Sequence, residues 1–184
     1  MDLKNVVKKT IPGDVLCYSA HYDSPLGGIT LGSDGVSLTG LWFDGQRFFA
    51  DGLGEEYEER ADLTIFCDTC RWLDMYFGGR MPNFTPPLLL RATPFRQRVW
   101  QLLLDIPYGH IVTYGSLARQ LGCRSAQAVG GAVGHNPISL IIPCHRVVGT
   151  GGMLTGYAGG LDLKMRLLEM EKTTSNEITE KIMK

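Results

Sequence analysis

Residues 136–160 read NPISLIIPCHRVVGTGGMLTGYAGG, and this stretch places Cys144 directly before His145. In a regular strand the two neighbouring side chains would point to opposite faces. Pro143 fixes its own φ and restricts Ile142, so it favours an irregular turn at this point. Two interpretations stay open: a buried strand that happens to carry both residues, or a nucleophilic thiol with its base.

A reactive thiol at Cys144 would need a nearby base and a group that orients this base. His145 is the candidate base, and Glu171 is the candidate for orienting or charging it. The segment 161–172 that contains Glu171 is amphipathic and predicts a last helix. The inward face of this helix is expected to carry Leu161, Leu163, Leu167, Leu168 and Met170.

Two short helices are predicted upstream of the cysteine. Thr113 can cap a helix over 114–121, which Gly122 can end, and a second helix is predicted over 125–133. Two short helices joined by a tight turn form the helix-turn-helix pattern, although many helical hairpins with this pattern bind no DNA. Before them, Thr93 and Pro94 are suited to the N-cap and first position of another helix.

The second short helix is unusual because its side chains are very small. Each interior glycine costs about 0.5–1 kcal/mol relative to alanine, so two of them need a reason. Tight packing in the core is one reason, and close approach of the helix to a nucleic-acid groove is the other. The small residues are Ala126, Ala128, Gly130, Gly131, Ala132 and Gly134.

The N-terminal half has a β-type pattern. Short apolar runs at 15–22, 27–32 and 36–43, separated by turn signals, predict an antiparallel meander, and a helix is expected to end at Phe77. A proline-rich linker follows at about 80–90. The expected fold class is therefore α+β, with an N-terminal domain over 1–85, a mostly helical domain over 86–172 and a polar tail over 173–184.

The distribution of charge and the number of cysteines limit the functions that the protein can have. Residues 1–90 carry 7 basic and 13 acidic side chains, whereas residues 91–172 carry 9 and 4. The basic half could meet a polyanion or could simply be a solvated surface. No signal peptide or membrane helix is visible, and five cysteines without a secretion signal indicate reduced thiols in a cytoplasm.

A metal site in the N-terminal half is an open alternative. Cys17, His21, Cys67 and Cys70 could together supply four zinc ligands. Cys67 and Cys70 lie on a predicted helix, where a spacing of three only reflects the neighbouring turn. The ordinary interpretation, and the one expected here, is four unligated side chains.

Taken together, these segments resemble the O6-alkylguanine-DNA alkyltransferases, the methylated-DNA–protein-cysteine methyltransferase family, in their bacterial form. The resemblance rests first on the Pro-Cys-His-Arg core and the glycine-rich segment that follows it. It also rests on VTYGSLARQLG and AVGGAVG before this core, and on YDSPLGGITLGSDG in the N-terminal half. It implies a ribonuclease H-like N-terminal domain and a winged-helix-like DNA-binding domain. It further implies a monomer without a cofactor.

The resemblance also implies the activity, which is a single irreversible transfer of the O6-alkyl group of guanine, with O4-alkylthymine as an open second substrate. The damaged base would be flipped out of double-stranded DNA bound through the minor groove. The implied catalytic residues are Cys144 as acceptor, His145 as base through a bridging water, Glu171 and Asn136. The implied substrate and DNA contacts are Thr113, Tyr114, Ser125, Ala126, Gln127, Ala128, Gly130, Val133, Arg146, Val147, Tyr157 and Ala158.

Three positions depart from the family pattern. Gln127 stands where an arginine commonly fills the space of the flipped base, which predicts weaker binding or slower flipping. Ala158 replaces a serine of some members, which removes a hydroxyl contact. Ser139 replaces a proline expected near the pocket wall, which puts bulky O6-benzyl adducts in question.

Three other functions compete with this one. A lesion sensor of the same fold would lack the acceptor, but Cys144 is intact. A cysteine hydrolase would need an oxyanion hole and would leave the predicted DNA-reading helix without a purpose. A DNA-binding regulator would not need Cys144 at all.

Overall fold

The computed structural model describes residues 7–8, 17–51, 53 and 57–182, with side chains described for 17–51, 53 and 57–172. Its contacts divide the chain into two compact units. The first unit comprises residues 1–92 together with 137–139, and the second comprises residues 93–136 and 140–184. The observed division therefore falls between Ala92 and Thr93, with a three-residue return to the first unit.

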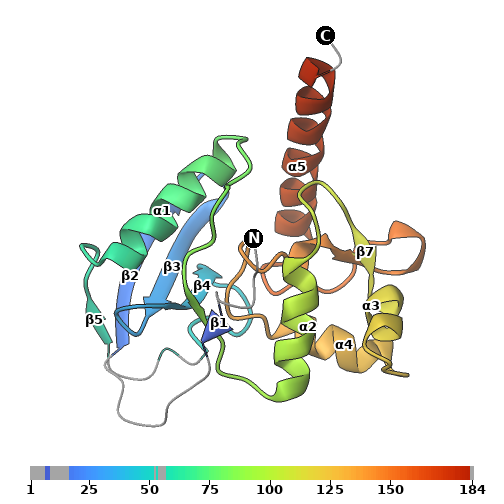
Figure 1. The fold of residues 1–184 in the computed structure, drawn as a ribbon, viewed down its shortest axis with the longest axis horizontal. Helices are drawn as coiled ribbons and strands as arrows, with labels where there is room; N and C mark the ends of the chain where they lie inside the picture. Colours follow the sequence, from blue (N-terminus) through green and yellow to red (C-terminus); the bar gives the residue numbers. More distant parts are fainter. Residues whose placement is uncertain (1–6, 9–16, 52, 54–56, 183–184) are drawn as a thin grey trace. The chain divides into compact units, whose positions relative to one another are not determined.

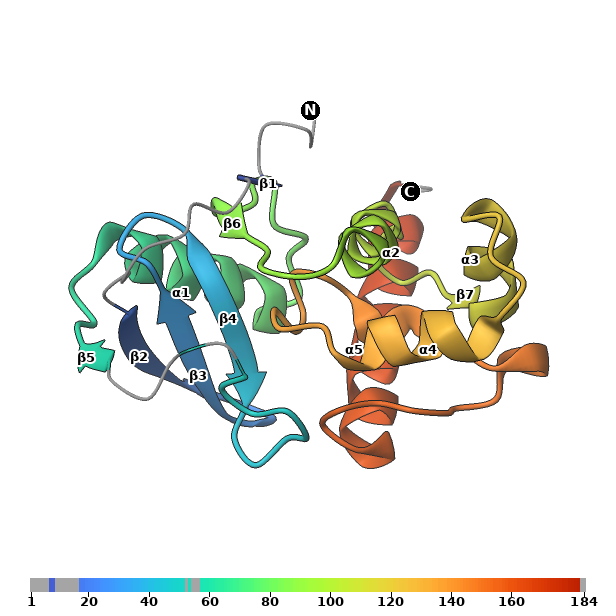
Figure 2. The same ribbon diagram turned by 90° about the horizontal axis from the view of Figure 1, so that it is seen from below.

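The first unit is built on a mixed sheet. Within its described residues, six strands follow the order β1-β6-β4-β3-β2-β5, and Figure 2 shows β5, β2, β3 and β4 side by side. The central three strands are antiparallel neighbours, as the predicted meander requires. The strands are β1 (Val7–Lys8), β2 (Cys17–Ser24), β3 (Gly27–Ser33), β4 (Leu38–Phe43), β5 (Tyr57–Glu59) and β6 (Leu88–Leu89).

The outer strands were not expected from the sequence. β5 pairs in parallel with β2, and β6 pairs in parallel with both β1 and β4. β5 has three exposed residues and an acidic sequence, so it lacks the alternation that marks a strand. The parallel outer strands therefore extend the predicted antiparallel meander into a mixed sheet, and β6 lies within the segment expected as linker.

One helix packs on this sheet. α1 (Thr64–Phe77) lies along β2 and β3 (Figure 1). Its buried residues recur at helical spacing, so one apolar face meets the sheet. These residues are Ile65, Phe66, Thr69, Trp72, Leu73 and Tyr76.

The second unit is mainly helical. Three of its helices begin at side-chain caps, because Thr93, Thr113 and Ser125 each accept a hydrogen bond from the backbone N–H of the third helical residue. The caps at Thr93 and Thr113 were predicted, whereas Ser125 was expected inside its helix and not as its cap. The indole of Trp100 donates to the carbonyl of Ala132 at 2.8 Å and so links two of these helices. The elements are α2 (Pro94–Leu104), β7 (Val112–Thr113), α3 (Tyr114–Gln120), α4 (Ala126–Gly134), η2 (Cys144–Arg146), β8 (Val147–Val148), η3 (Thr150–Gly152) and α5 (Leu161–Ile182).

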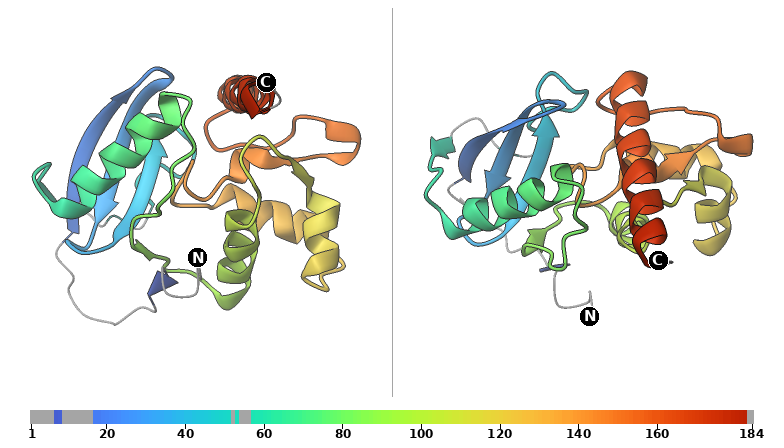
Figure 3. Two further views of the ribbon diagram at one scale, coloured as in Figure 1. Left: turned by 45° about the horizontal axis from the view of Figure 1, so that its top comes forward. Right: turned by 90° about the horizontal axis from the view of Figure 1, so that it is seen from above.

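α5 is the long red helix in Figure 3. The predicted inward face is only partly right, because Leu167 is buried but Leu161 is about half exposed. The fully buried face instead carries Lys164, Leu167 and Glu171, which lie three and four residues apart. None of the described helices combines the length and the apolar character needed to cross a membrane.

Candidate active site in the second unit

Cys144 begins a one-turn 3-10 helix directly after Pro143, so the chain does turn at this point as predicted. The thiol is buried, with 4% of the residue exposed. Asn136 donates through Nδ2 to the carbonyl of Ile142 at 2.8 Å and to Sγ of Cys144 at 3.1 Å. The asparagine therefore holds the loop closed and points one N–H at the sulfur.

His145 and Glu171 form the pair that the sequence predicted. Nε2 of His145 lies 2.8 Å from Oε1 of Glu171, and both side chains are fully buried. Arg146 adds a bidentate pair, because Nε donates to Oε2 and Nη2 to Oε1, each at 2.9 Å. The amide of Gly109 donates to Oε2 at 3.1 Å, so both oxygens of the carboxylate accept hydrogen bonds.

The charge states of this pair follow from these contacts. Burial acts to raise the pKa of Glu171, but the hydrogen bonds from His145 and Arg146 outweigh it and hold this pKa well below its usual range. Burial lowers the pKa of His145, so the ring is neutral near pH 7. A carboxylate only accepts, so Nε2 carries the ring proton and Nδ1 is the basic nitrogen. Nδ1 is buried without a hydrogen-bond partner among the residues described.

Lys164 is a site residue that the sequence analysis missed. Its side chain is fully buried, and Nζ donates to the carbonyls of Val147 at 2.5 Å, Thr155 at 2.7 Å and Gly156 at 3.3 Å. Burial lowers the pKa of Lys164 to about 8, and the nearby Cys144 thiolate opposes this shift. An amphipathic helix with a lysine at an inward position was the available signal.

The same lysine acts on the thiol. Burial raises the pKa of Cys144 above its ordinary value, while the Asn136 hydrogen bond and the charge of Lys164 both lower it. Removing either group therefore makes the thiolate harder to form.

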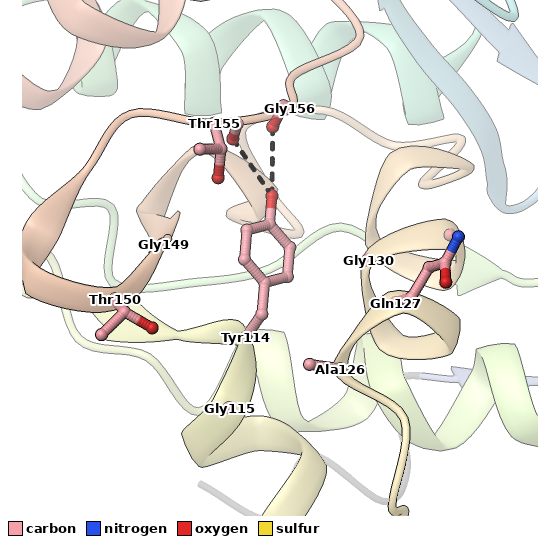
Figure 4. Close-up of a pocket in the computed structure, with 10 residues that line it drawn as sticks. Tyr114, Gly115, Ala126, Gln127, Gly130, Gly149, Thr150, Thr155 and Gly156 are labelled. Atoms are coloured by element: carbon pink, nitrogen blue, oxygen red, sulfur yellow. Dashed lines mark hydrogen bonds between the residues drawn. The ribbon is translucent and has the colours of Figure 1, made fainter.

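Tyr114 stands in a pocket of about 580 Å³ (Figure 4). Its hydroxyl donates to the carbonyls of Thr155 at 3.2 Å and Gly156 at 3.1 Å, which also accept from Lys164. The volume lies within the range of about 300–1,000 Å³ that is usual for small-ligand sites. The lining residues are Tyr114, Gly115, Ala126, Gln127, Gly130, Gly131, Gly149, Thr150, Thr155 and Gly156.

The residues expected to contact DNA on α3 and α4 fall into two groups. Ala126, Gln127 and Ala128 are exposed at the start of α4, and Gly130 is half-buried beside the ring of Tyr114. Val133 is buried, with its side chain in the core. Thr113 and Ser125 are the N-caps of α3 and α4, since their hydroxyls accept from Ser116 N and Ala128 N at 3.1 Å.

The four expected contact residues after the cysteine lie mostly inward. Arg146 is 8% exposed, and besides its bonds to Glu171 it donates a hydrogen bond from Nη1 to the carbonyl of Ile106 at 2.7 Å. Val147 is buried in β8, and its carbonyl accepts from Lys164. The ring of Tyr157 meets the His145 ring edge-on at 6.5 Å, and Ala158 is half-buried.

The alternative zinc ligands do not come together as a set. His21 faces Asp23 at 3.3 Å and Asp44 at 3.9 Å, whereas Cys67 lies on α1 with its sulfur 4.0 Å from the carbonyls of Ala61 and Asp62. Across the part of the chain that the structure describes, His, Cys, Asp and Glu side chains form no group of three or more suited to a metal.

Two of the departures from the family pattern can be placed. Gln127 lines the pocket from α4 (Figure 4). Ser139 is buried in the first unit, and its hydroxyl lies 3.3 Å from Oε1 of Gln46. Ser139 is not among the residues that line the pocket described above.

Comparison with known proteins agrees with this architecture. Residues 17–90 match the 6-O-methylguanine DNA methyltransferase ribonuclease-like domain, and residues 94–173 match the DNA binding domain of the same family. A methylated-DNA–protein-cysteine methyltransferase of Mycobacterium tuberculosis is 44% identical over 162 residues, covering 83% of this chain and 93% of the relative. Its counterpart in Haemophilus influenzae is 40% identical over 157 residues, covering 84% and 86%.

Solved structures of the same family also match this chain. The crystal structure of Mycobacterium tuberculosis OGT in complex with DNA has a TM-score of 0.78 and 42% identity, and the match covers 85% of this chain and 94% of that one. Together with the two domain matches, this confirms the expected α+β fold with a ribonuclease-like first domain and a helical second domain. The chain belongs to the 6-O-methylguanine DNA methyltransferase family.

Proposed function

We propose that the protein repairs O6-alkylguanine in double-stranded DNA by moving the alkyl group from O6 to Sγ of Cys144. The bond between O6 and the alkyl carbon breaks, the S–C bond forms, and the thiol proton ends on N1 of the restored guanine, which stays in the DNA strand. No further reactant is consumed. The observation that carries the proposal is the buried Cys144 thiol with Asn136, Lys164 and the His145–Glu171 pair around it, in a chain of this family.

His145 is the base of this reaction. Its Nδ1 carries the free lone pair, because Nε2 donates to the ionised Glu171. The proton of Cys144 would reach Nδ1 through an ordered water, since neighbouring residues in a 3-10 turn do not face each other directly. Glu171 fixes the ring orientation and its tautomer, and Arg146 with Gly109 fixes Glu171.

The thiolate is stabilised by two groups of the second unit. Asn136 donates a hydrogen bond to Sγ, and Lys164 supplies positive charge. A thiolate is a soft nucleophile that suits displacement at an alkyl carbon. The product is a thioether, which none of these groups can hydrolyse, so each molecule acts once.

DNA would bind through the minor groove, with α4 against the groove. The support is the exposed small residues Ala126 and Ala128 at the start of α4, beside a pocket large enough to hold a nucleobase. A guanine stacked in the duplex hides its O6, so the base must be flipped out at a cost of a few kcal/mol. Tyr114, held by the carbonyls of Thr155 and Gly156, would contact the flipped nucleotide. The Mycobacterium tuberculosis relative was crystallised in complex with DNA.

Single-turnover kinetics test this proposal. Duplex DNA with one O6-methylguanine is mixed with increasing amounts of protein, and the remaining lesion is counted. We expect one lesion removed per protein molecule, with no second turnover after a long incubation. Continued turnover, or equal repair by Cys144→Ser, would overturn the proposal.

A further inference from the structure

Residues 137–139 extend the sheet of the first unit, although the residues on both sides belong to the second unit. The amide of Leu41 in β4 donates to the carbonyl of Pro137 at 2.8 Å, and the amide of Ser139 donates to the carbonyl of Leu41 at 2.9 Å. These bonds form a parallel bridge between Leu41 and Ile138. Leu41, Ile138 and Ser139 are all buried, so water does not compete for these bonds.

A buried side-chain contact adds to this pairing. The hydroxyl of Ser139 donates to Oε1 of Gln46 at 3.3 Å, and the same oxygen accepts from the amide of Phe43 at 3.0 Å. Gln46 follows β4 in the chain and is 7% exposed. One amide oxygen therefore joins the end of β4 to Ser139.

The two neighbours of this segment matter for the site. Asn136 comes directly before it and donates to Sγ of Cys144. Leu140 comes directly after it and has a φ of 68° although it is a buried leucine. A non-glycine residue in the left-handed region persists only where the surrounding structure imposes it.

We infer that Ser139 and Gln46 are positioning residues for alkyl transfer, because they fix the segment from which Asn136 reaches Cys144. This inference rests on the proposed function of Cys144. Ser139 and Gln46 would thus influence Cys144 through the backbone that leads from Pro137 to Asn136. Ser139 and Gln46 are buried and are not among the residues that line the pocket, so we expect DNA affinity not to depend on them.

The test compares three single variants and one double variant with the wild-type protein. Ser139→Ala and Gln46→Met remove the two partners. Ser33→Ala is the control, because it removes a buried hydroxyl of the same unit whose partners among the described residues are Ser37 and Gly35. The transfer rate constant is measured at saturating duplex from pH 6 to pH 9, together with the duplex Kd and the unfolding midpoint.

We expect Ser139→Ala to slow transfer about 3- to 10-fold at pH 7, the ratio that one lost hydrogen bond gives. The rise of the rate with pH should move to higher pH, because Asn136 donates less well to the thiolate. The titratable groups around Cys144 are His145, Lys164 and Tyr114, with Glu171 and Arg146 behind His145, and all of them are unchanged in all variants. The Ser139→Ala/Gln46→Met double variant should be no slower than Gln46→Met alone, and the duplex Kd should stay constant.

A purely structural role would give another result. Ser139→Ala would then lower the unfolding midpoint as Ser33→Ala does, and both would keep the wild-type rate and pH profile. That result overturns the inference while leaving the proposed function intact. Failure of the proposed function would appear separately, as a wild-type protein that transfers no methyl group.

Discussion

At the scale of single residues, α5 places two charged side chains, Lys164 and Glu171, on a fully buried face. Glu171 is compensated by Arg146, His145 and an amide, whereas Lys164 is bonded to three backbone carbonyls. A buried ammonium without a bonded carboxylate is costly, so its position beside the thiol suggests a functional reason.

Replacing Lys164 tests this reason. Lys164→Met keeps the length of the side chain but removes the charge that lowers the pKa of Cys144. We expect the transfer rate at pH 7 to fall about tenfold for each unit by which this pKa rises. Single-turnover kinetics across pH measure the effect, and Arg166→Met, an exposed cation on the same helix, is the control. An unchanged pH profile in Lys164→Met would contradict the assignment.

Replacing Glu171 tests the buried ion pair. Glu171→Gln leaves Arg146 without its charged partner, so the unfolding free energy at pH 7 should fall by about 3–5 kcal/mol. Because the folded-state pKa of Glu171 is lowered, its contribution is complete above the unfolded value of about 4.3 and is lost as the pH falls below it. Urea unfolding should therefore show a gap between wild type and variant that narrows in acid. The role of the buried ion pair would be contradicted by a difference in unfolding free energy that stays constant with pH. It would also be contradicted if Glu169→Gln, at an exposed position, lost as much unfolding free energy as Glu171→Gln.

Gln127 is the residue whose replacement should increase activity. It lines the pocket from α4, where a longer, charged side chain could occupy the space of a flipped base and pair with phosphate or base oxygens. Gln127→Arg should therefore tighten duplex binding and speed repair at limiting protein concentration. Equal repair rates for wild type and variant would show that Gln127 already serves this purpose.

At the scale of elements, α4 combines a good N-cap with glycines that weaken its interior. A Cβ at Gly131 would meet nothing within 4 Å, so packing within the described residues does not explain this glycine. Gly131 does line the pocket, which leaves approach to a ligand as the reason.

Gly131→Ala should therefore separate stability from binding. We expect the unfolding free energy to rise by about 0.5–1 kcal/mol and the duplex Kd to rise several-fold. Gly134→Ala is the matched control, because it also has open space around its Cβ but does not line the pocket. If Gly131→Ala binds DNA as tightly as Gly134→Ala, α4 does not approach the groove at this point.

The sequence predicted those elements whose signals are local. Thr93 and Thr113 mark helix starts by their own hydroxyls, and the Pro143–His145 turn follows from the proline, whereas the cap at Ser125 was not predicted. β5, β6 and residues 137–139 could not be predicted in the same way, because their partners lie far away in the chain. Lys164 was missed for a similar reason, since its burial depends on carbonyls of Val147, Thr155 and Gly156 that only the folded loop brings together.

At the scale of the whole molecule, charge is divided along the chain. Residues 91–172, which contain the site, carry 9 basic and 4 acidic side chains, whereas residues 1–90 carry 7 and 13. DNA binding by the second unit should therefore depend on salt, because neutralised phosphates release counterions. Four such contacts would weaken binding about 100-fold between about 50 and about 200 mM salt, and fluorescence anisotropy would show it. A Kd independent of salt would contradict binding through this surface.

Whether Cys144 accepts the alkyl group is measured most directly by mass spectrometry of the protein after reaction with an O6-methylguanine duplex. We expect the intact mass to rise by one methyl group in place of a proton, and fragmentation to place this methyl group on Cys144. The Cys144→Ser variant should keep its original mass. An unchanged wild-type mass, or a methyl group on another cysteine, would show that Cys144 is not the acceptor.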